Sequence, residues 1–263
     1  MAVVLEGGCR VTEMREGTPV VSGTLTCWGQ IGKANGAQAI SLRILQFGPG
    51  LSPGVSNVDS DEVLYLLEGP DESETIHSCT VFIDGQPHEI ASQTGVYLRP
   101  GQTLTVNNQE SKAAVFVSSQ CPEPVAEWDT VDPVVTPATD AVEIHTLPFV
   151  RLADRKALPT ADRWYRVLID DEVGSTQVTQ FVGSIPSGRA PDHFHQYEEV
   201  LFILRGKGRM WAGNTSAPIS AGSCIYLPKG QLHCVENTGQ DELRLLGVFY
   251  PAGSPAVRYG PED

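Results

Sequence analysis

Two blocks of this sequence occur twice in the same order, and this repeat limits the possible folds more than any other feature. The block EVLYLLEG at residues 62–69 returns as EVLFILRG at 199–206. The block VYLRPGQTLTVNN at 96–108 returns as IYLPKGQLHCVEN at 225–237. Because the two blocks keep their order, the repeat indicates two copies of one domain within a single chain.

The segment between the two copies differs from both in composition. Residues 121–150 are rich in proline and acidic side chains, which suits an extended connection over a surface. We therefore predict a first domain at residues 1–120, a proline-rich linker at 121–150 and a second domain at 151–263.

Short apolar runs separated by turn residues indicate that both copies are built from β-strands. Runs such as CTVFIDG, GVYLRPG and CIYLPKG are rich in β-branched or aromatic residues and end at glycine or proline. The chain holds 26 glycines and 19 prolines along its length, which suits frequent turns. Helical periodicity is weak, with room for one short helix within residues 150–164. We therefore predict an all-β protein with antiparallel sheets that form sandwiches or barrels.

The charge of the chain argues against nucleic acid as a partner. It carries 18 Lys and Arg against 32 Asp and Glu, a formal net charge of −14, and would repel a phosphate backbone. It has neither a signal-peptide pattern nor an apolar run of about 18 residues, and its 6 cysteines lack CxxC spacing. We therefore expect a cytoplasmic protein with reduced thiols, a small-molecule substrate and no membrane partner. A homodimer is the protein assembly that paired barrels suggest.

The stretch DHFHQYEEVLFILRG at residues 192–206 concentrates the titratable side chains of the second copy. Residues two apart in a strand point to the same face, so His193 and His195 project together with Glu199, while Glu198 points away. His233 follows a Pro-Lys-Gly turn and could reach the same place from a neighbouring strand. Three imidazoles and a carboxylate suit a transition metal and leave one or two coordination positions open, as a catalytic metal requires.

These residues give the second half a resemblance to the cupin family. The first cupin motif, a glycine followed by HxH, Glu and Gly, is matched by Gly188, His193, His195, Glu199 and Gly206, with one residue fewer than usual after the first glycine. The second motif, G(x)5PxG(x)2H(x)3N, is matched at every spacing, and its residues in this sequence are Gly222, Pro228, Gly230, His233 and Asn237. The resemblance implies a jelly-roll β-barrel whose metal ligands are His193, His195, Glu199 and His233.

The first half is similar to a cupin that has lost its metal ligands. Alignment on the repeated blocks places Ser56 and Val58 opposite the HxH pair, Leu104 opposite His233 and Glu62 opposite Glu199. One carboxylate cannot hold a transition metal. The whole chain thus resembles a bicupin, with two jelly-roll barrels and a complete metal motif in the second barrel only.

Four further residues are weaker candidates for a substrate pocket. Arg189 precedes the HxH pair and could meet an anionic substrate, while Tyr226 and Trp211 could line the pocket. Gln231 shares the parity of His233, although it lies in the turn.

The resemblance implies a metal-dependent enzyme for a small organic molecule, and our leading interpretation is a non-haem dioxygenase-type oxidoreductase. One divalent transition metal per chain is expected, Fe first, with Mn, Ni, Zn or Cu as alternatives. Glu199 would leave the metal and act as the general base. The alternatives are an isomerase, lyase or decarboxylase that does not use O2, or a non-catalytic cupin that binds a small ligand. Decarboxylase bicupins usually keep ligands in both halves, which this chain does not.

Overall fold

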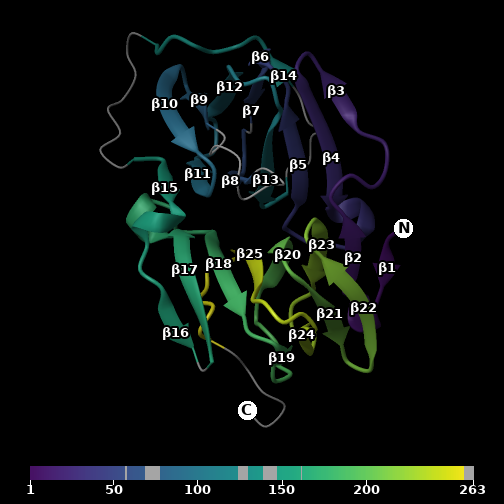
Figure 1. Ribbon diagram of the computed structural model, residues 1–263. Coiled ribbons are helices and arrows are strands. Elements are labelled where there is room, and N and C mark those ends of the chain that lie inside the picture. Colours follow the sequence, from purple (N-terminus) through teal and green to yellow (C-terminus); the bar gives the residue numbers. More distant parts are fainter. Residues whose placement is uncertain (57, 69–77, 124–129, 139–146, 161, 258–263) are drawn as a thin grey trace.

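The computed structural model of the protein describes residues 1–56, 58–68, 78–123, 130–138, 147–160 and 162–257. Two β-barrels lie one above the other, and every strand pairing between neighbours is antiparallel (Figure 1). Helical turns are short: η1 (Glu6–Gly8), η2 (Lys33–Asn35), η3 (Leu152–Asp154) and η4 (Asp171–Val173). Within these described ranges, no helix has the length and apolar character needed to cross a membrane. The predicted all-β bicupin fold is confirmed.

The first barrel consists of two sheets. The larger sheet has seven strands, in spatial order β15 (Phe149–Arg151), β11 (Thr94–Leu98), β8 (Asp61–Leu66), β13 (Ala114–Cys121), β5 (Leu42–Phe47), β4 (Leu25–Ile31) and β3 (Val20–Ser22). The smaller sheet runs in the order β10 (Gln86–Ala91), β9 (Ser78–Ile83), β12 (Thr103–Asn108), β7 (Gly54–Ser56) and β14 (Thr130–Val131), and β6 (Gly50–Leu51) also pairs with β12. Their facing side chains form one apolar core.

The second barrel repeats this plan. Its larger sheet has eight strands, in the order β1 (Val3–Val4), β2 (Arg10–Glu13), β23 (Ser223–Leu227), β20 (Glu198–Arg205), β25 (Leu243–Tyr250), β18 (Thr179–Ile185), β17 (Arg163–Ile169) and β16 (Leu158–Thr160). Its smaller sheet has four, in the order β19 (Gly188–Arg189), β24 (His233–Asn237), β21 (Lys207–Ala212) and β22 (Thr215–Ser220).

Strand pairing departs from the predicted domain boundaries at both ends of the first domain. β1 and β2 belong to the second barrel, because β2 pairs with β23, and Figure 1 shows these purple strands beside the lower barrel. In the other direction, β14 and β15 fall within the predicted linker or at its end, yet they pair with β7 and β11 of the first barrel. Residues 124–129 and 139–146 of the predicted linker lie outside the described residues. The chain therefore crosses between the barrels more often than a simple tandem repeat would.

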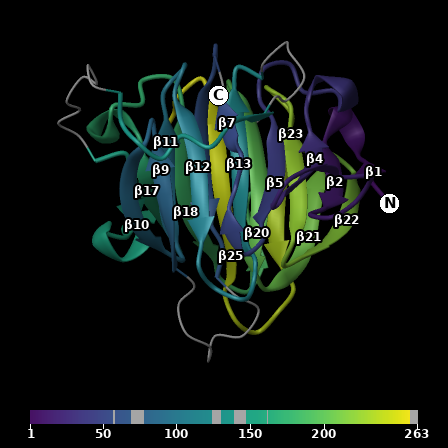
Figure 2. The ribbon, with the colours of Figure 1, turned by 90° about the horizontal axis from the view of Figure 1, so that it is seen from above.

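The larger sheets of the two barrels pack face to face and share one apolar core (Figure 1), and from above the strands of the two barrels overlap (Figure 2). Along β20, Leu201 and Ile203 point into the core of their own barrel, whereas Val200 and Phe202 join a core shared with the first barrel. Both faces of this strand are thus buried, which explains why its sequence is a continuous apolar run and not an alternating one. All six cysteines are buried and unpaired by disulfides.

Candidate metal centre

Three histidines converge at the open end of the second barrel. His193 lies just before β20 and His233 begins β24, and the two residues form a small antiparallel bridge with N–H···O distances of 3.0 and 2.8 Å. The turn before β24 is held to the same strand by the Gly230 amide, which donates to the His195 carbonyl at 2.8 Å. As a result, one possible ligand atom from each of His193, His195 and His233 lies within 4.8 Å of the others.

Backbone carbonyls orient two of the three imidazoles. The Nδ1 atom of His193 lies 3.0 Å from the Pro191 carbonyl oxygen, and that of His233 lies 2.7 Å from the Gln231 carbonyl oxygen. A carbonyl accepts, so in a neutral ring Nδ1 carries the proton and Nε2 keeps its lone pair for a metal. This is the arrangement expected of metal-binding histidines.

Glu199 points to the same side as the histidines, and its neighbour Glu198 points to the other barrel. An oxygen of Glu199 lies 3.5 Å from Nε2 of His195 and 3.8 Å from Nε2 of His233. The Glu198 carboxylate instead accepts from the amides of Gln38 and Ala39 in the first barrel, at 2.8 and 2.7 Å. The strand alternation used in the sequence analysis thus separates the two adjacent carboxylates correctly.

Burial makes this cluster unfavourable for charge unless a cation joins it. Glu199 is 4% exposed, and burial raises its pKa from 4.5 to about 8. Burial, with a smaller effect of the nearby His193, lowers the pKa of His233 from 6.5 to about 3. At neutral pH His233 is therefore a neutral donor, and a divalent cation would supply the positive charge that favours the carboxylate form of Glu199. The donor set fits a transition metal.

The pH dependence of metal binding follows from the raised pKa of Glu199. Without metal the carboxyl group stays protonated below about pH 8, whereas a bound ion requires the carboxylate. Each ion then displaces one proton, so affinity is expected to rise about tenfold per pH unit from pH 6 to 8 and level off above that. A chelator competition at several pH values measures this slope. Glu199→Gln should abolish the slope, and a flat profile for the natural protein would contradict the assignment.

The cluster forms the inner wall of a small pocket, here called the metal pocket, with a cavity volume of about 90 Å³. Aromatic rings support it: the His195 ring stacks on Tyr197 at a centroid distance of 5.0 Å and an angle of 9°, and Phe249 lies 4.5 Å from the Tyr197 ring. Among the described lining residues, Arg163 is the only Lys or Arg and Glu199 the only Asp or Glu. The Arg163 side chain is 11% exposed and pairs with Asp162.

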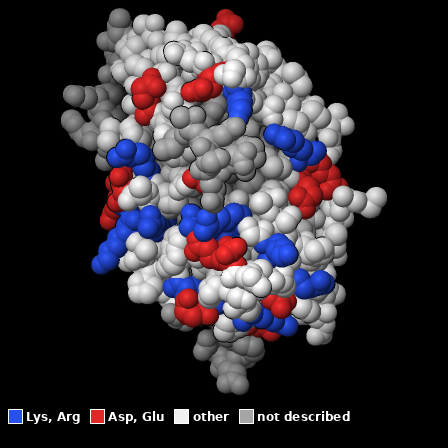
Figure 3. Space-filling view, in the orientation of Figure 1, with Lys and Arg blue, Asp and Glu red and all other residues white. Residues whose placement is uncertain are grey.

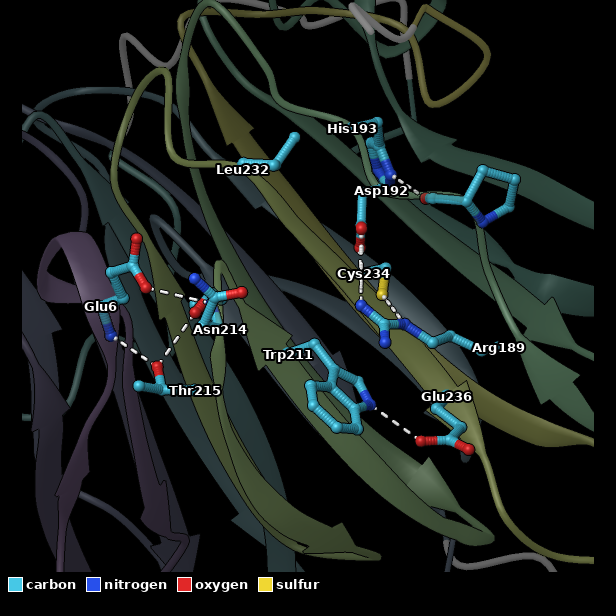
Figure 4. Close-up of polar contacts among 12 residues, drawn as sticks. Glu6, Arg189, Asp192, His193, Trp211, Asn214, Thr215, Leu232, Cys234 and Glu236 are labelled. Atoms are coloured by element: carbon cyan, nitrogen blue, oxygen red, sulfur yellow. Dashed lines mark hydrogen bonds and ion pairs between the residues drawn. The ribbon is translucent and has the colours of Figure 1, made fainter. Parts of the chain in front are cut away.

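Two of the four predicted pocket residues lie on the outer face of the smaller sheet instead. The guanidinium of Arg189 lies over the Trp211 ring, 4.3 Å from its centroid, and forms an ion pair with Asp192 (Figure 4). The Trp211 indole N–H donates to Glu236 at 2.8 Å (Figure 4). Trp211 is paired with Cys234, not with His233, so strand alternation turns it away from the metal pocket.

The other two predicted pocket residues also lie elsewhere. Tyr226 pairs with Val200, shares its face between the barrels and donates its hydroxyl hydrogen to Glu198. Gln231 lies over the N-terminal segment: a Cβ atom built on Gly7 would fall 1.4 Å from its Oε1. A side chain at residue 7 would therefore displace Gln231, and the positive φ of 68° at this position also favours glycine.

Residues around the metal pocket other than the ligands were not predicted from the sequence. Tyr197, which supports the His195 ring from behind the ligands, could have been found, because it shares the odd-numbered face of His193, His195 and Glu199. Arg163 gave no such signal, because it comes from β17, which reaches this barrel mouth through pairing with β18.

In the first barrel, the carboxylate that corresponds to Glu199 is paired with an arginine and not with histidines. Glu62 points into the barrel core like its counterpart Glu199, and it is 1% exposed. The Arg43 guanidinium forms an ion pair with it at 2.8 Å, and Ser118 and Gln120 donate to the same carboxylate at 2.5 and 3.1 Å. Arg43 thus supplies the positive charge that an ion would otherwise have to provide.

Comparisons with known proteins agree with this architecture. The family model of the cupin domain matches residues 181–249. An uncharacterised protein of Aquifex aeolicus is 30% identical over 84 residues, which are 31% of this chain and 68% of that protein. Auxin-binding protein 1 of Arabidopsis thaliana is 34% identical over 73 residues, or 24% of this chain and 37% of that protein. The oxalate-binding protein of Thermotoga maritima is 37% identical over 58 residues, or 22% of this chain and 48% of that protein. The chain thus covers less than half the length of these last two relatives.

Solved structures extend the likeness to both barrels. A mutant of the oxalate decarboxylase of Bacillus subtilis superposes with a TM-score of 0.74 at 14% sequence identity. The superposition covers 93% of this chain and 78% of the chain of that mutant. Another mutant of the same enzyme gives a TM-score of 0.73 with the same coverage at 13% identity. Such low identity supports the fold alone. Motifs, barrels and matches together make this chain a member of the cupin family, a bicupin whose complete metal motif lies in its second barrel.

Proposed function

We propose that the second barrel is a metal-dependent enzyme that decarboxylates a small carboxylic acid, with oxalate as the simplest candidate. The observation that carries this proposal is the composition of the metal pocket. Its cavity of about 90 Å³ combines three imidazoles and Glu199 with Arg163, the one Lys or Arg among its described lining residues. A small dicarboxylate could meet the metal at one end and the guanidinium at the other.

The size of the pocket favours this reaction over the dioxygenase interpretation. Pockets for drug-sized molecules measure about 300–1,000 Å³, so a cavity of about 90 Å³ suits a substrate with few heavy atoms and not a flavonol. The names of two similar proteins, oxalate-binding protein and oxalate decarboxylase, point to the same class of ligand. They support the decarboxylase alternative over the O2-dependent one.

The proposed cofactor is one ion of manganese or iron, held by His193, His195, His233 and Glu199. Three imidazoles and a hard carboxylate suit both metals, and the similar Bacillus subtilis enzyme has Mn(II) centres. When bound, such an ion polarises a coordinated carboxylate as a Lewis acid. Elemental analysis of the purified protein identifies the metal.

The roles of the protein residues follow from the reaction. Loss of CO2 from hydrogen oxalate breaks the C–C bond and leaves its electron pair on the carbon that becomes formate, so that carbon must receive one proton. Glu199, the only acid among the described lining residues, is assigned this transfer: its carboxylate would take the acidic proton of hydrogen oxalate and return it to that carbon. Arg163 would hold the distal carboxylate, and Phe249, Leu201 and Leu245 would keep water from the reacting carbon.

A product balance tests the proposed reaction. Protein loaded with Mn(II) or Fe(II) is incubated with oxalate, and CO2, formate and dissolved O2 are followed together. Decarboxylation gives equal amounts of CO2 and formate with no net consumption of O2. Net O2 consumption would support the dioxygenase interpretation, and neither product would reject both reactions for this substrate.

Substitution of Glu199 separates proton transfer from metal binding. Glu199→Gln keeps three imidazoles and a neutral amide oxygen, so we expect measurable metal content with turnover reduced by about 100- to 10,000-fold. Metal content by mass spectrometry and formate release are measured on the same preparation. Full activity of this variant would contradict the role of Glu199.

Binding without turnover is the second candidate function. It is favoured by one relative, the oxalate-binding protein, which is 37% identical over 58 residues. Calorimetry with oxalate that gives tight binding, together with an absence of formate, would identify this function.

A further inference from the structure

A second and larger cavity lies at one end of the interface between the barrels. It has a volume of about 480 Å³ and is called here the inter-barrel pocket. The first barrel contributes Tyr65, Leu67 and Val115, and the second contributes Phe202 and Leu204. Elsewhere along this interface apolar side chains fill the space, so this volume is a gap in an otherwise packed core.

Basic side chains surround the apolar floor of this pocket. Arg15, Arg205 and Arg244 line it, and Glu68 is the one acid among its described lining residues. Glu242 forms ion pairs with both Arg205 and Arg244, so among the residues that the structure describes here three positive charges face two negative ones. The Nε atom of Arg244 is buried without a hydrogen-bond partner.

This charge stands out because the chain carries 18 Lys and Arg against 32 Asp and Glu. Lys and Arg side chains also gather across the middle of the face in Figure 3, at the level where the barrels meet in Figure 1.

We propose that the inter-barrel pocket binds a small organic anion with an apolar body, such as a medium-chain monocarboxylate. The volume lies in the range of small-molecule sites, and an apolar floor with a few polar groups at its edge is their usual composition. A guanidinium accepts a carboxylate through paired N–H donors, while Tyr65, Leu67, Phe202 and Leu204 contact the alkyl chain.

This site is separate from the metal pocket. Phe202 and Leu204 occupy the even-numbered face of β20, opposite the face that carries Glu199. Arg205 ends β20 and Glu199 lies near its start, so six residues of strand place them about 20 Å apart. The proposal therefore does not depend on the reaction proposed for the metal pocket.

Calorimetry of the metal-loaded protein with octanoate, octanol and acetate tests the proposal. We expect one octanoate per chain, bound at least about tenfold more tightly than octanol, which lacks the charge, or acetate, which lacks the alkyl chain. Equal affinity for all three, or no binding of octanoate, would overturn the proposal.

Three variants locate the binding. Ala221→Trp fills the pocket from an exposed turn and should abolish octanoate binding without changing the metal content. Arg244→Met should remove the preference for octanoate over octanol. Arg209→Met, a control on the outer face of the smaller sheet, should bind normally. His233→Ala should still bind octanoate, because loss of binding there would assign it to the metal pocket and overturn the proposal.

Discussion

Replacement of His233 by alanine is expected to remove most of the bound metal and lower the metal affinity by more than about 100-fold. Nε2 of this residue faces Glu199, and one of its possible ligand atoms lies within 4.8 Å of those of His193 and His195. Loss of the His233 imidazole leaves two imidazoles and one carboxylate as ligands. It also leaves a cavity where the ring was packed. Mass spectrometry of metal content and a chelator competition measure the change. His193→Ala should behave in the same way.

The adjacent glutamates provide a matched control. Glu198→Ala should keep its metal, because this carboxylate accepts hydrogen bonds from Gln38 and Ala39 of the first barrel. It should instead lower the free energy of unfolding, since two backbone amides and the Tyr226 hydroxyl lose a charged acceptor. Full metal occupancy in His233→Ala, or metal loss in Glu198→Ala with retention in Glu199→Ala, would reject the ligand assignment.

Replacement of Arg43 by methionine is expected to reduce the free energy of unfolding by about 3–5 kcal/mol, the usual cost of removing one partner from a buried ion pair. The two partners are almost inaccessible, with exposed side-chain fractions of 9% for Arg43 and 1% for Glu62. Without the guanidinium, the carboxylate would have to remain charged in an apolar core or take up a proton. Urea unfolding followed by circular dichroism measures the loss.

A double substitution shows whether charge is the cause. Arg43→Met combined with Glu62→Gln removes both charges and should recover part of the stability lost in Arg43→Met. Arg209→Met, on the surface of the second barrel, controls for the change from arginine to methionine. A loss in Arg43→Met no larger than in this control would show that the ion pair is not needed to balance Glu62.

The fold and the cluster of three histidines with Glu199 could be predicted from the sequence, because both depend on patterns within short stretches of the chain. The repeated blocks gave the two barrels, and the two-residue period of a strand assigned Glu199 and Glu198 to opposite faces before any pairing was known. The position of His233 needed more than periodicity, and it came from the matched spacing of the second motif.

The substrate pocket could not be predicted in this way. Arg189, Trp211, Tyr226 and Gln231 are close to the ligands along the chain, yet each faces the outer surface, the other barrel or the N-terminal segment. The pocket is completed by Arg163 of β17, which lies well before the first motif in the sequence, and by Phe249 of β25, which lies outside both motifs. A residue's neighbours in a sheet include residues of its own strand and residues of the strands paired with it. Only the first kind can be predicted from proximity along the sequence.

By itself, the sequence determined that this chain forms two β-barrels and that His193, His195 and Glu199 point to one side as candidate metal ligands, because strand period and motif spacing are local properties. Only the tertiary structure decided that residues 3–13 complete the second barrel, that Arg43 neutralises Glu62, and that three arginines surround a gap between the barrels. These contacts join residues far apart in the chain, and they depend on which sheets meet and in which register, which no local pattern encodes.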